Sequence, residues 1–254
     1  MKFNMLILPP LEKQKTKKHM QTTKTKALLS GSNAKLEKGT KLGWLTLGLS
    51  LAPANLSGRE LCPHRSKGCT IACLFTSGYG RFDGVKNARM ERTRFFLTRR
   101  AEFLAQLIAE IRKGEKAAKK KGMELAVRLN VMSDLPWHNL IDMAAFPAVQ
   151  FYDYTPNIKR ALQWAAGELP ANYHITFSRK EDNQDAVALA VAAGVNVATV
   201  FDAVPTEYAG RPVVDGDVSD LRFLDQRGVI VGLKAKGDGK KDTSGFVIRT
   251  TVNV

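Results

Sequence analysis

Apolar and polar positions follow two different periods along this chain. Residues 44–51 (WLTLGLSL) alternate apolar with small side chains, and this pattern predicts a first strand that ends before Pro53. Further strands are predicted over residues 125–131, 148–152, 173–177, 195–201 and 228–233, which are short apolar runs rich in β-branched side chains. Helical spacing marks residues 85–112, where one face holds Phe96, Phe103, Leu104, Leu107, Ile108 and Ile111.

Helix-sized segments separate the later strands. Helices are predicted over residues 138–145, 157–167 and 184–193, and residues 113–121 are interpreted as a charged connector. Strands that alternate with helices indicate right-handed βαβ units and a parallel sheet. About six strands are too few for a closed eight-stranded barrel. We therefore expect a partial, about six-stranded parallel β/α barrel, with a doubly wound sheet as the second choice.

The charge distribution divides the chain into two parts. Residues 1–30 hold many lysines and few acids, so we expect a flexible basic arm, and residues 31–254 are expected to form a single α/β domain. The net charge is +15 and the isoelectric point is near 9.8. Such an arm is either a solvated tail or a segment that binds nucleic acid through phosphate contacts.

No apolar run approaches the roughly 20 residues that a membrane-spanning helix needs. The opening residues 1–8 also lack the long apolar core and cleavage site of a signal peptide. We therefore expect no membrane contact and a cytoplasmic location.

All three cysteines of the chain lie in one loop-rich segment, residues 54–84, which follows the first strand. They are Cys62, Cys69 and Cys73, and an odd number of clustered cysteines without an export signal argues against a disulfide framework. Cys69 and Cys73 are four residues apart, so a helical turn would place both sulfurs on one face. Neighbouring Arg and Lys side chains are expected to favour the thiolate, which is the metal-binding form. The spacing predicts a metal centre.

Two metals compete for this motif. Structural zinc prefers four protein ligands, and His64 is the candidate fourth ligand, although the spacing fits no common zinc finger. A [4Fe-4S] cluster needs one ligand for each iron, so three cysteines would leave one iron open for a substrate or cofactor. We favour the iron–sulfur cluster over zinc, and zinc over three thiols without a metal.

Polar side chains follow the predicted strands at the edge of the sheet where the cysteine loop also begins. In β/α folds this edge carries the chemistry. Candidate catalytic residues are Asp134 or His64 as a general base and Arg179 as a group that holds an anionic substrate. Asp134 has an alternative role as the N-cap of the helix that follows it.

Several segments resemble the bacteriophage "gene product 88-like" family. They are LAPANLSG at 51–58, CPHRSKGCTIACLFTSGYGR at 62–81, ARMERTRFF at 88–96, RLNVMSDLPW at 128–137 and KKDTSGFV at 240–247. The resemblance covers nearly all of residues 30–250 and implies a phage origin, and thus an infected bacterial cell as the location. It supplies no activity.

The layout is also similar, more distantly, to the radical S-adenosylmethionine enzymes, in which a three-cysteine loop follows the first strand of a partial barrel. Their cysteines are typically spaced C-x3-C-x2-C, whereas this chain has C-x6-C-x3-C. They also carry a Gly-Gly-Glu-like segment where this chain has Val131–Asp134. By this analogy the cysteines would bind the cluster and S-adenosylmethionine would be the cofactor.

Two functions of different classes remain open. The first is an enzyme in which the open iron acts as a Lewis acid for hydrolysis or hydration, or starts radical chemistry from S-adenosylmethionine. The second is a non-catalytic protein that binds nucleic acid or a host factor, in which a metal only stabilises the loop. For this second function, Arg89, Arg92, Arg99 and Arg100 are the candidate phosphate contacts.

Overall fold

The computed structural model describes residues 26–31 and 38–250. Most of the N-terminal arm therefore lies outside the described residues. Its last residues, however, belong to the fold, since β1 (Leu29–Ser30) pairs antiparallel with β2 (Trp44–Leu49). Leu28 and Leu29 are buried, and their amides donate to the Glu110 carboxylate at 2.9 and 2.8 Å. The expected boundary at residue 30 thus lies too late in the chain.

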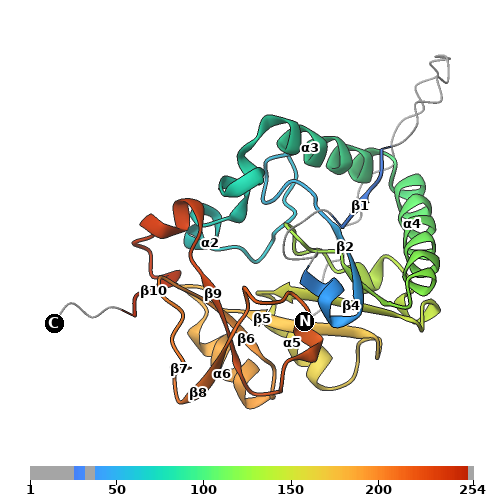
Figure 1. Ribbon diagram of the computed structural model, residues 1–254. Helices are drawn as coiled ribbons and strands as arrows, with labels where there is room; N and C mark the ends of the chain where they lie inside the picture. The colour runs from blue at the N-terminus through green and yellow to red at the C-terminus, as the bar shows by residue number, and fades with distance from the viewer. Residues whose placement is uncertain (1–25, 32–37, 251–254) are drawn as a thin grey trace, which may run out of the picture.

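Within the described chain, a mostly parallel sheet of ten strands forms the centre of the molecule (Figure 1). The strand order is β1-β2-β3-β4-β5-β6-β9-β8-β7, and β10 also pairs with β6. The parallel strands are β2, β3 (Glu124–Arg128), β4 (Val149–Thr155), β5 (Tyr173–Ser178), β6 (Val197–Phe201), β9 (Ile230–Lys234) and β8 (Arg211–Asp215). β7 (Glu207–Tyr208) forms an antiparallel edge.

The strands from β2 to β6 and then β9 lie side by side in chain order. A doubly wound sheet reverses its order at a switch point, and this sheet has no such reversal between β2 and β9. The second fold expectation is therefore wrong. The sheet is open, because β1 and β7 lie at its two ends.

Five α-helices are described. Three of the four longer ones pack directly on one face of the sheet, and the first of the four packs on the second. The four are α3 (Asp83–Thr98), α4 (Arg100–Lys120), α5 (Ile158–Ala165) and α6 (Gln184–Ala192); the fifth, α2 (Lys67–Ile71), lies in the cysteine segment. The large apolar core lies between these four helices and the odd-numbered residues of the central strands, such as Leu125, Val127 and Phe151. Figure 1 shows α4 on the outside of the sheet and α3 next to it, over the loop segment that follows β2.

The predicted single helix over 85–112 is in fact two helices. The backbone breaks at Arg99, with φ −137° and ψ 53°, and α4 then continues to Lys120. The segment 113–121 is thus not a connector: Gly114 and Ala118 are buried in α4, and a Cβ on Gly114 would lie 2.6 Å from a Leu47 methyl carbon. The predicted helix over 138–145 is wrong too, since only two short 3-10 turns form there, at Trp137–Asn139 and Met143–Ala145.

The opposite face of the sheet is more polar and is covered by the segment that follows β8. Ala126, Tyr152 and Leu221 form a small core there, with Trp44 and Phe223 beside it. Within this face the Arg128 guanidinium pairs with Asp220 at 2.9 Å, and the Tyr152 hydroxyl donates to the same carboxylate at 3.2 Å. This network fixes the covering segment to β3 and β4.

The C-terminal segment enters the sheet beside the carboxyl half of β6. β5 pairs with β6 only as far as Ser178↔Ala198, and β10 (Val247–Ile248) then pairs with the next part, at Val247↔Val200. The Arg179 guanidinium, just beyond β5, donates to the carbonyl oxygens of Gly245 and Phe246, both at 2.8 Å. β5 therefore stops pairing with β6 at the point where β10, in the C-terminal segment, begins to pair with it. No helix of the described residues has both the length and the apolar character needed to cross a membrane.

Candidate functional site

The cysteine segment leaves the carboxyl end of β2 and forms a short helix over that end of the sheet. Cys62 precedes α2, Cys69 lies within it, and Cys73 follows its C-terminal cap, Ala72. Ser66 caps the helix N-terminus, since its hydroxyl accepts from the Cys69 amide at 3.1 Å.

The three thiols lie close enough to influence one another electrostatically. Cys73 raises the pKa of Cys62, and both Cys62 and Cys73 raise the pKa of Cys69. None of the three forms a disulfide, and all are partly buried. However, no group of three or more His, Cys, Asp or Glu side chains is arranged to hold a metal ion in the part of the chain that the structure describes.

Burial controls the protonation of these thiols. It raises the pKa of Cys62 to about 11 and that of Cys69 to about 12, and it also raises the pKa of Cys73. The expectation that basic neighbours make these thiols acidic is therefore wrong for the protein without a bound metal. Lys180 lowers the pKa of Cys69 and Arg89 lowers that of Cys73, but desolvation outweighs both cations.

The end of β5 holds the cysteine helix in place through Glu181. This carboxylate accepts from the Ser66 hydroxyl and from the Gly68 amide, each at 2.7 Å. Gly68 itself is packed so closely that a Cβ would collide with the Ser244 hydroxyl and lie 2.7 Å from the Cβ of Phe246. The helix is therefore enclosed between the end of β5 and the C-terminal segment.

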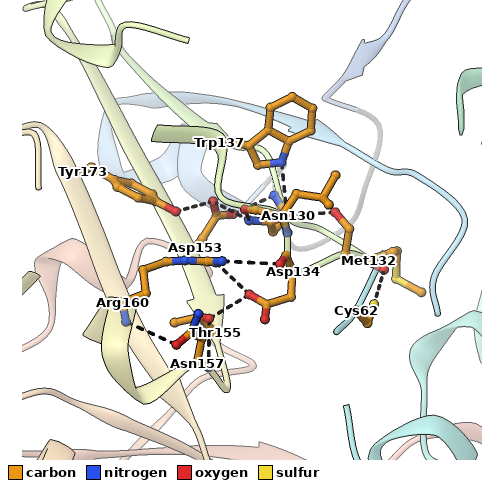
Figure 2. Close-up of polar contacts among 12 residues, drawn as sticks. Cys62, Asn130, Met132, Asp134, Trp137, Asp153, Thr155, Asn157, Arg160 and Tyr173 are labelled. Carbon is orange, nitrogen blue, oxygen red and sulfur yellow. Dashed lines mark hydrogen bonds and ion pairs between the residues drawn. The ribbon is translucent and has the colours of Figure 1, made fainter. Parts of the chain in front are cut away.

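Asp134 lies at the carboxyl end of β3, and its carboxylate points towards β4 and α5 (Figure 2). Its Oδ1 accepts from the Thr155 hydroxyl at 2.7 Å and from the Arg160 guanidinium at 2.7 Å. Its Oδ2 is buried and has no hydrogen-bond partner among the described residues. Burial raises the pKa of this carboxyl, although Arg160, Thr155 and His64 act to lower it.

Asp134 also connects this network to the cysteine loop. Its amide donates to the Leu61 carbonyl at 2.8 Å, and its charge raises the pKa of the adjacent Cys62. The Cys62 sulfur lies 3.6 Å from the Met132 carbonyl oxygen, to which it donates. The N-cap alternative for Asp134 is wrong, because Pro136 precedes the turn at Trp137 and the carboxylate bonds elsewhere.

A second buried carboxylate shapes the loop that presents Asp134. Asp153 accepts from the Asn130 amide at 2.7 Å, from the Asn130 side-chain nitrogen at 3.1 Å and from the Tyr173 hydroxyl at 3.0 Å. Asn130 in turn accepts from Ser133, Leu135 and Trp137. Burial raises the pKa of Asp153 to about 7. Residues 130–137 are therefore rigidly attached to β4 and β5 (Figure 2).

The other two candidate catalytic residues occupy different positions. His64 is exposed, lies two residues after Cys62, and is near enough to Asp134 to lower that carboxyl's pKa. Arg179 is 7% exposed, and two of its hydrogen bonds go to the carbonyls of the C-terminal segment. The structure therefore brings His64 and Asp134 together near Cys62, whereas Arg179 fixes the chain terminus.

The four arginines considered for phosphate contacts have partners within the protein. Arg89 is partly buried, and its guanidinium lies 5.7 Å from the centre of the Phe75 ring, but its Nε and Nη1 have no hydrogen-bond partner among the described residues. Arg92 donates to the Ala27 and Ser50 carbonyls at 3.2 and 3.4 Å. Arg99 pairs with Glu102, and the Arg100 guanidinium lies 4.6 Å from the centre of the Phe96 ring.

Two open hollows flank the cysteine segment. One of about 550 Å³ is bounded by Glu60, Pro63, Arg65 and the residues of α2, and the other, of about 330 Å³, lies between residues 57–59 and α3. Hollows of this size are in the range that accommodates small ligands.

Sequence reasoning missed the residues that support the cysteines from elsewhere in the chain. Glu181 accepts from the Gly68 amide, Arg160 donates to Asp134, and Arg89 lowers the pKa of Cys73. Glu181 and Arg160 lie far in sequence from the residues that they contact. Glu181 follows a predicted strand, so its place at this edge could be foreseen. Its contact with a loop 113 residues away could not.

Comparison with known proteins gives a family for this chain. The model of the Gene product 88 family matches residues 21–250. No curated protein and no solved structure matches the chain. The match includes β1 to β10 and the whole cysteine segment, and we conclude that the chain belongs to the Gene product 88 family of bacteriophage proteins.

Proposed function

We propose that Cys62, Cys69 and Cys73 bind a [4Fe-4S] cluster with one open iron, and that the protein is an enzyme acting on a small molecule at this site. One observation carries the proposal: the three thiols come from one loop at the carboxyl edge of a parallel sheet, and Cys62 and Cys73 lie near enough to Cys69 to raise its pKa. The enzyme would act inside the infected bacterial cell.

The donor set suits this group. Three cysteines that form no disulfide can supply three thiolates, which are the usual ligands of iron–sulfur clusters. A cluster distributes its thiolates over separate irons, so its ligands need not gather round a single ion. Zinc, with His64 as the fourth ligand, is the alternative occupant.

An open iron would supply either a Lewis acid or, once reduced, an electron for radical chemistry with S-adenosylmethionine. The order of the parallel strands is the order found in an open β/α barrel, which we propose as the finer description of the sheet. The similarity to the radical S-adenosylmethionine enzymes remains part of this proposal and has no further support.

The residues around the cysteines define what the chain itself could contribute. Asp134 presents a buried carboxylate oxygen that has no hydrogen-bond partner in the described part of the chain, so it is suited to accept a hydrogen bond or a proton from a bound substrate. Arg160 holds the other oxygen and so fixes its orientation. Lys180, beside Cys69, is the nearer cation for an anionic substrate, since Arg179 is engaged with the C-terminal segment. Its ammonium group pairs with the exposed Asp182 at 3.0 Å, and a substrate anion would replace that carboxylate.

The first experiment is anaerobic purification followed by iron and sulfide assays and a visible spectrum. We expect about four irons per chain and broad absorption near 400 nm, a general property of such cubes. Single Cys→Ser replacements should each remove most of the iron. Ser77→Ala is the matched control in the same loop, because its exposed hydroxyl bonds only to the neighbouring Leu74 carbonyl.

A colourless protein with one zinc per chain would overturn the cluster and support the zinc alternative. If iron is present, incubation of the reduced protein with S-adenosylmethionine separates the two chemistries. Cleavage of the cofactor supports the radical reaction. If neither cleavage nor a spectral change occurs, the Lewis-acid reaction remains. For that reaction, Asp134→Asn should lower turnover without lowering the iron content.

A further inference from the structure

Exposed apolar side chains concentrate in the cysteine segment and at the start of α3. Among the described residues, half of the exposed large apolar side chains fall between positions 56 and 82: Leu56, Ile71, Leu74, Tyr79 and Phe82. Tyr79 is the most exposed of them, at 83%. Isolated exposed apolar residues are ordinary, but a concentration in one segment marks a contact surface.

The two exposed aromatic residues of this segment, Tyr79 and Phe82, form a paired surface. The Tyr79 and Phe82 rings lie 5.9 Å apart, and the Arg81 guanidinium lies 5.8 Å from the centre of the Phe82 ring. The turn beneath them is tight, because a Cβ on Gly80 would come within 2.8 Å of the Leu74 carbonyl oxygen. Tyr79 is thus held outward on a fixed backbone. We call Tyr79, Arg81 and Phe82 the aromatic ridge.

The surrounding charge favours an anionic partner. Residues 65–94 include seven Lys and Arg and only two acidic residues, Asp83 and Glu91. Both acids are already in ion pairs, with Lys86 at 3.4 Å and with Lys26 at 2.9 Å. Arg81 has no ion pair within residues 26–31 and 38–250, so its charge is available to a partner.

We propose that the aromatic ridge binds single-stranded nucleic acid. Every base offers a flat face that stacks on an exposed aromatic ring, and the adjacent guanidinium meets the phosphate next to it. A surface that bound a protein through apolar contacts alone would not need Arg81, a cation without an ion pair among the described residues, beside the exposed Tyr79 ring. Duplex DNA keeps its bases stacked on one another and cannot use the ridge. This inference does not depend on the proposed cluster.

The test measures the anisotropy of a fluorescently labelled 20-residue oligo-dT with the full-length protein. Tyr79→Ala should weaken binding about 5-fold to 30-fold, the loss of one stacked base, with little change in the salt dependence. Arg81→Gln should weaken binding and reduce the slope of log affinity against log salt by about one phosphate contact. Tyr79→Trp should retain or strengthen binding.

Two surface variants serve as controls. Leu189→Ala removes an exposed apolar side chain on α6, and Lys119→Gln removes a charge near the end of α4; neither should change the affinity by more than about 2-fold. Because Tyr79 is so exposed, its variants should unfold at the wild-type temperature.

Three outcomes would overturn the proposal. The first is equal affinity of wild type and Tyr79→Ala for oligo-dT, which would place binding elsewhere, for example on the basic arm. The second is binding of a 20-bp duplex as tight as that of the single strand. The third is a polyglutamate peptide of equal charge that binds as tightly and with the same dependence on Tyr79, which would identify a surface for an acidic protein.

Discussion

At the scale of single residues, Asp153 makes folding sensitive to pH. Its carboxyl is 1% exposed, and burial raises its pKa from 3.8 to about 7. The folded protein therefore binds this proton more tightly than the unfolded chain does. The free energy of unfolding contributed by Asp153 is greatest below about pH 4 and falls as the pH rises to about 7. The loss is up to about 4 kcal/mol, at roughly 1.4 kcal/mol per pKa unit.

Replacement of Asp153 by Asn should remove this dependence. The unfolding free energy of wild type minus that of Asp153→Asn, measured in urea at half-unit pH steps, should fall as the pH rises from about 4 to about 7. The subtraction is needed because His174 acts in the opposite direction: burial lowers its pKa to about 4, so its contribution is lost as the pH falls from about 6.5. Asp185→Asn on the surface of α6 is the control. A difference that stays constant with pH would contradict the prediction.

At the scale of elements, the sequence predicted the strands that have strong apolar patterns. β2, β3, β4, β5, β6 and β9 all lie at predicted positions within a few residues. The break at Arg99 was not predictable, because Thr98–Arg100 contains neither Gly nor Pro. β7 and β10 have two residues each, too few to show a period, and they form because of their neighbours.

The position of α2 depends on one small residue. Gly68→Ala should displace the helix, because the added Cβ would collide with Ser244 and lie 2.8 Å from a Glu181 oxygen. Overpacking of this kind typically costs about 1–3 kcal/mol of stability. We expect a lower urea midpoint and, if the cluster exists, a loss of iron on gel filtration.

Gly84→Ala provides the matched control for this substitution. Gly84 lies in the first turn of α3 and a Cβ there would meet nothing within 4 Å. Its replacement should leave stability unchanged or raise it by up to about 1 kcal/mol, through helix propensity. A Gly68→Ala protein as stable and as rich in iron as the Gly84→Ala protein would show that the close packing round α2 is unimportant.

At the scale of the whole molecule, the candidate site joins parts of the chain that only the fold brings together. The spacing of the cysteines predicts a shared metal centre, which stays a prediction. The parallel sheet predicted that Asp134 lies at the same edge, where its charge raises the pKa of Cys62. The sequence did not indicate that the C-terminal segment returns to this edge. β10 pairs with β6, and Ser244 contacts the cysteine helix, because β5 ends early and Arg179 binds the returning backbone.

Arg179 should therefore couple the position of the C-terminal segment, residues 245–248, to that of the cysteine helix. Arg179→Ala removes the donors to Gly245 and Phe246 and leaves two carbonyl groups without those partners, which we expect to cost about 1–3 kcal/mol. Ser244 and Phe246, in the released segment, would then no longer pack closely against Gly68. Hydrogen exchange should therefore speed up both at Val247, in β10, and at the Cys69 amide. Lys234→Ala, at the exposed last position of β9, is the control. Faster exchange at Val247 with unchanged exchange at Cys69 would show that the terminus and the cysteine helix are independent, and would confine Arg179 to holding β10.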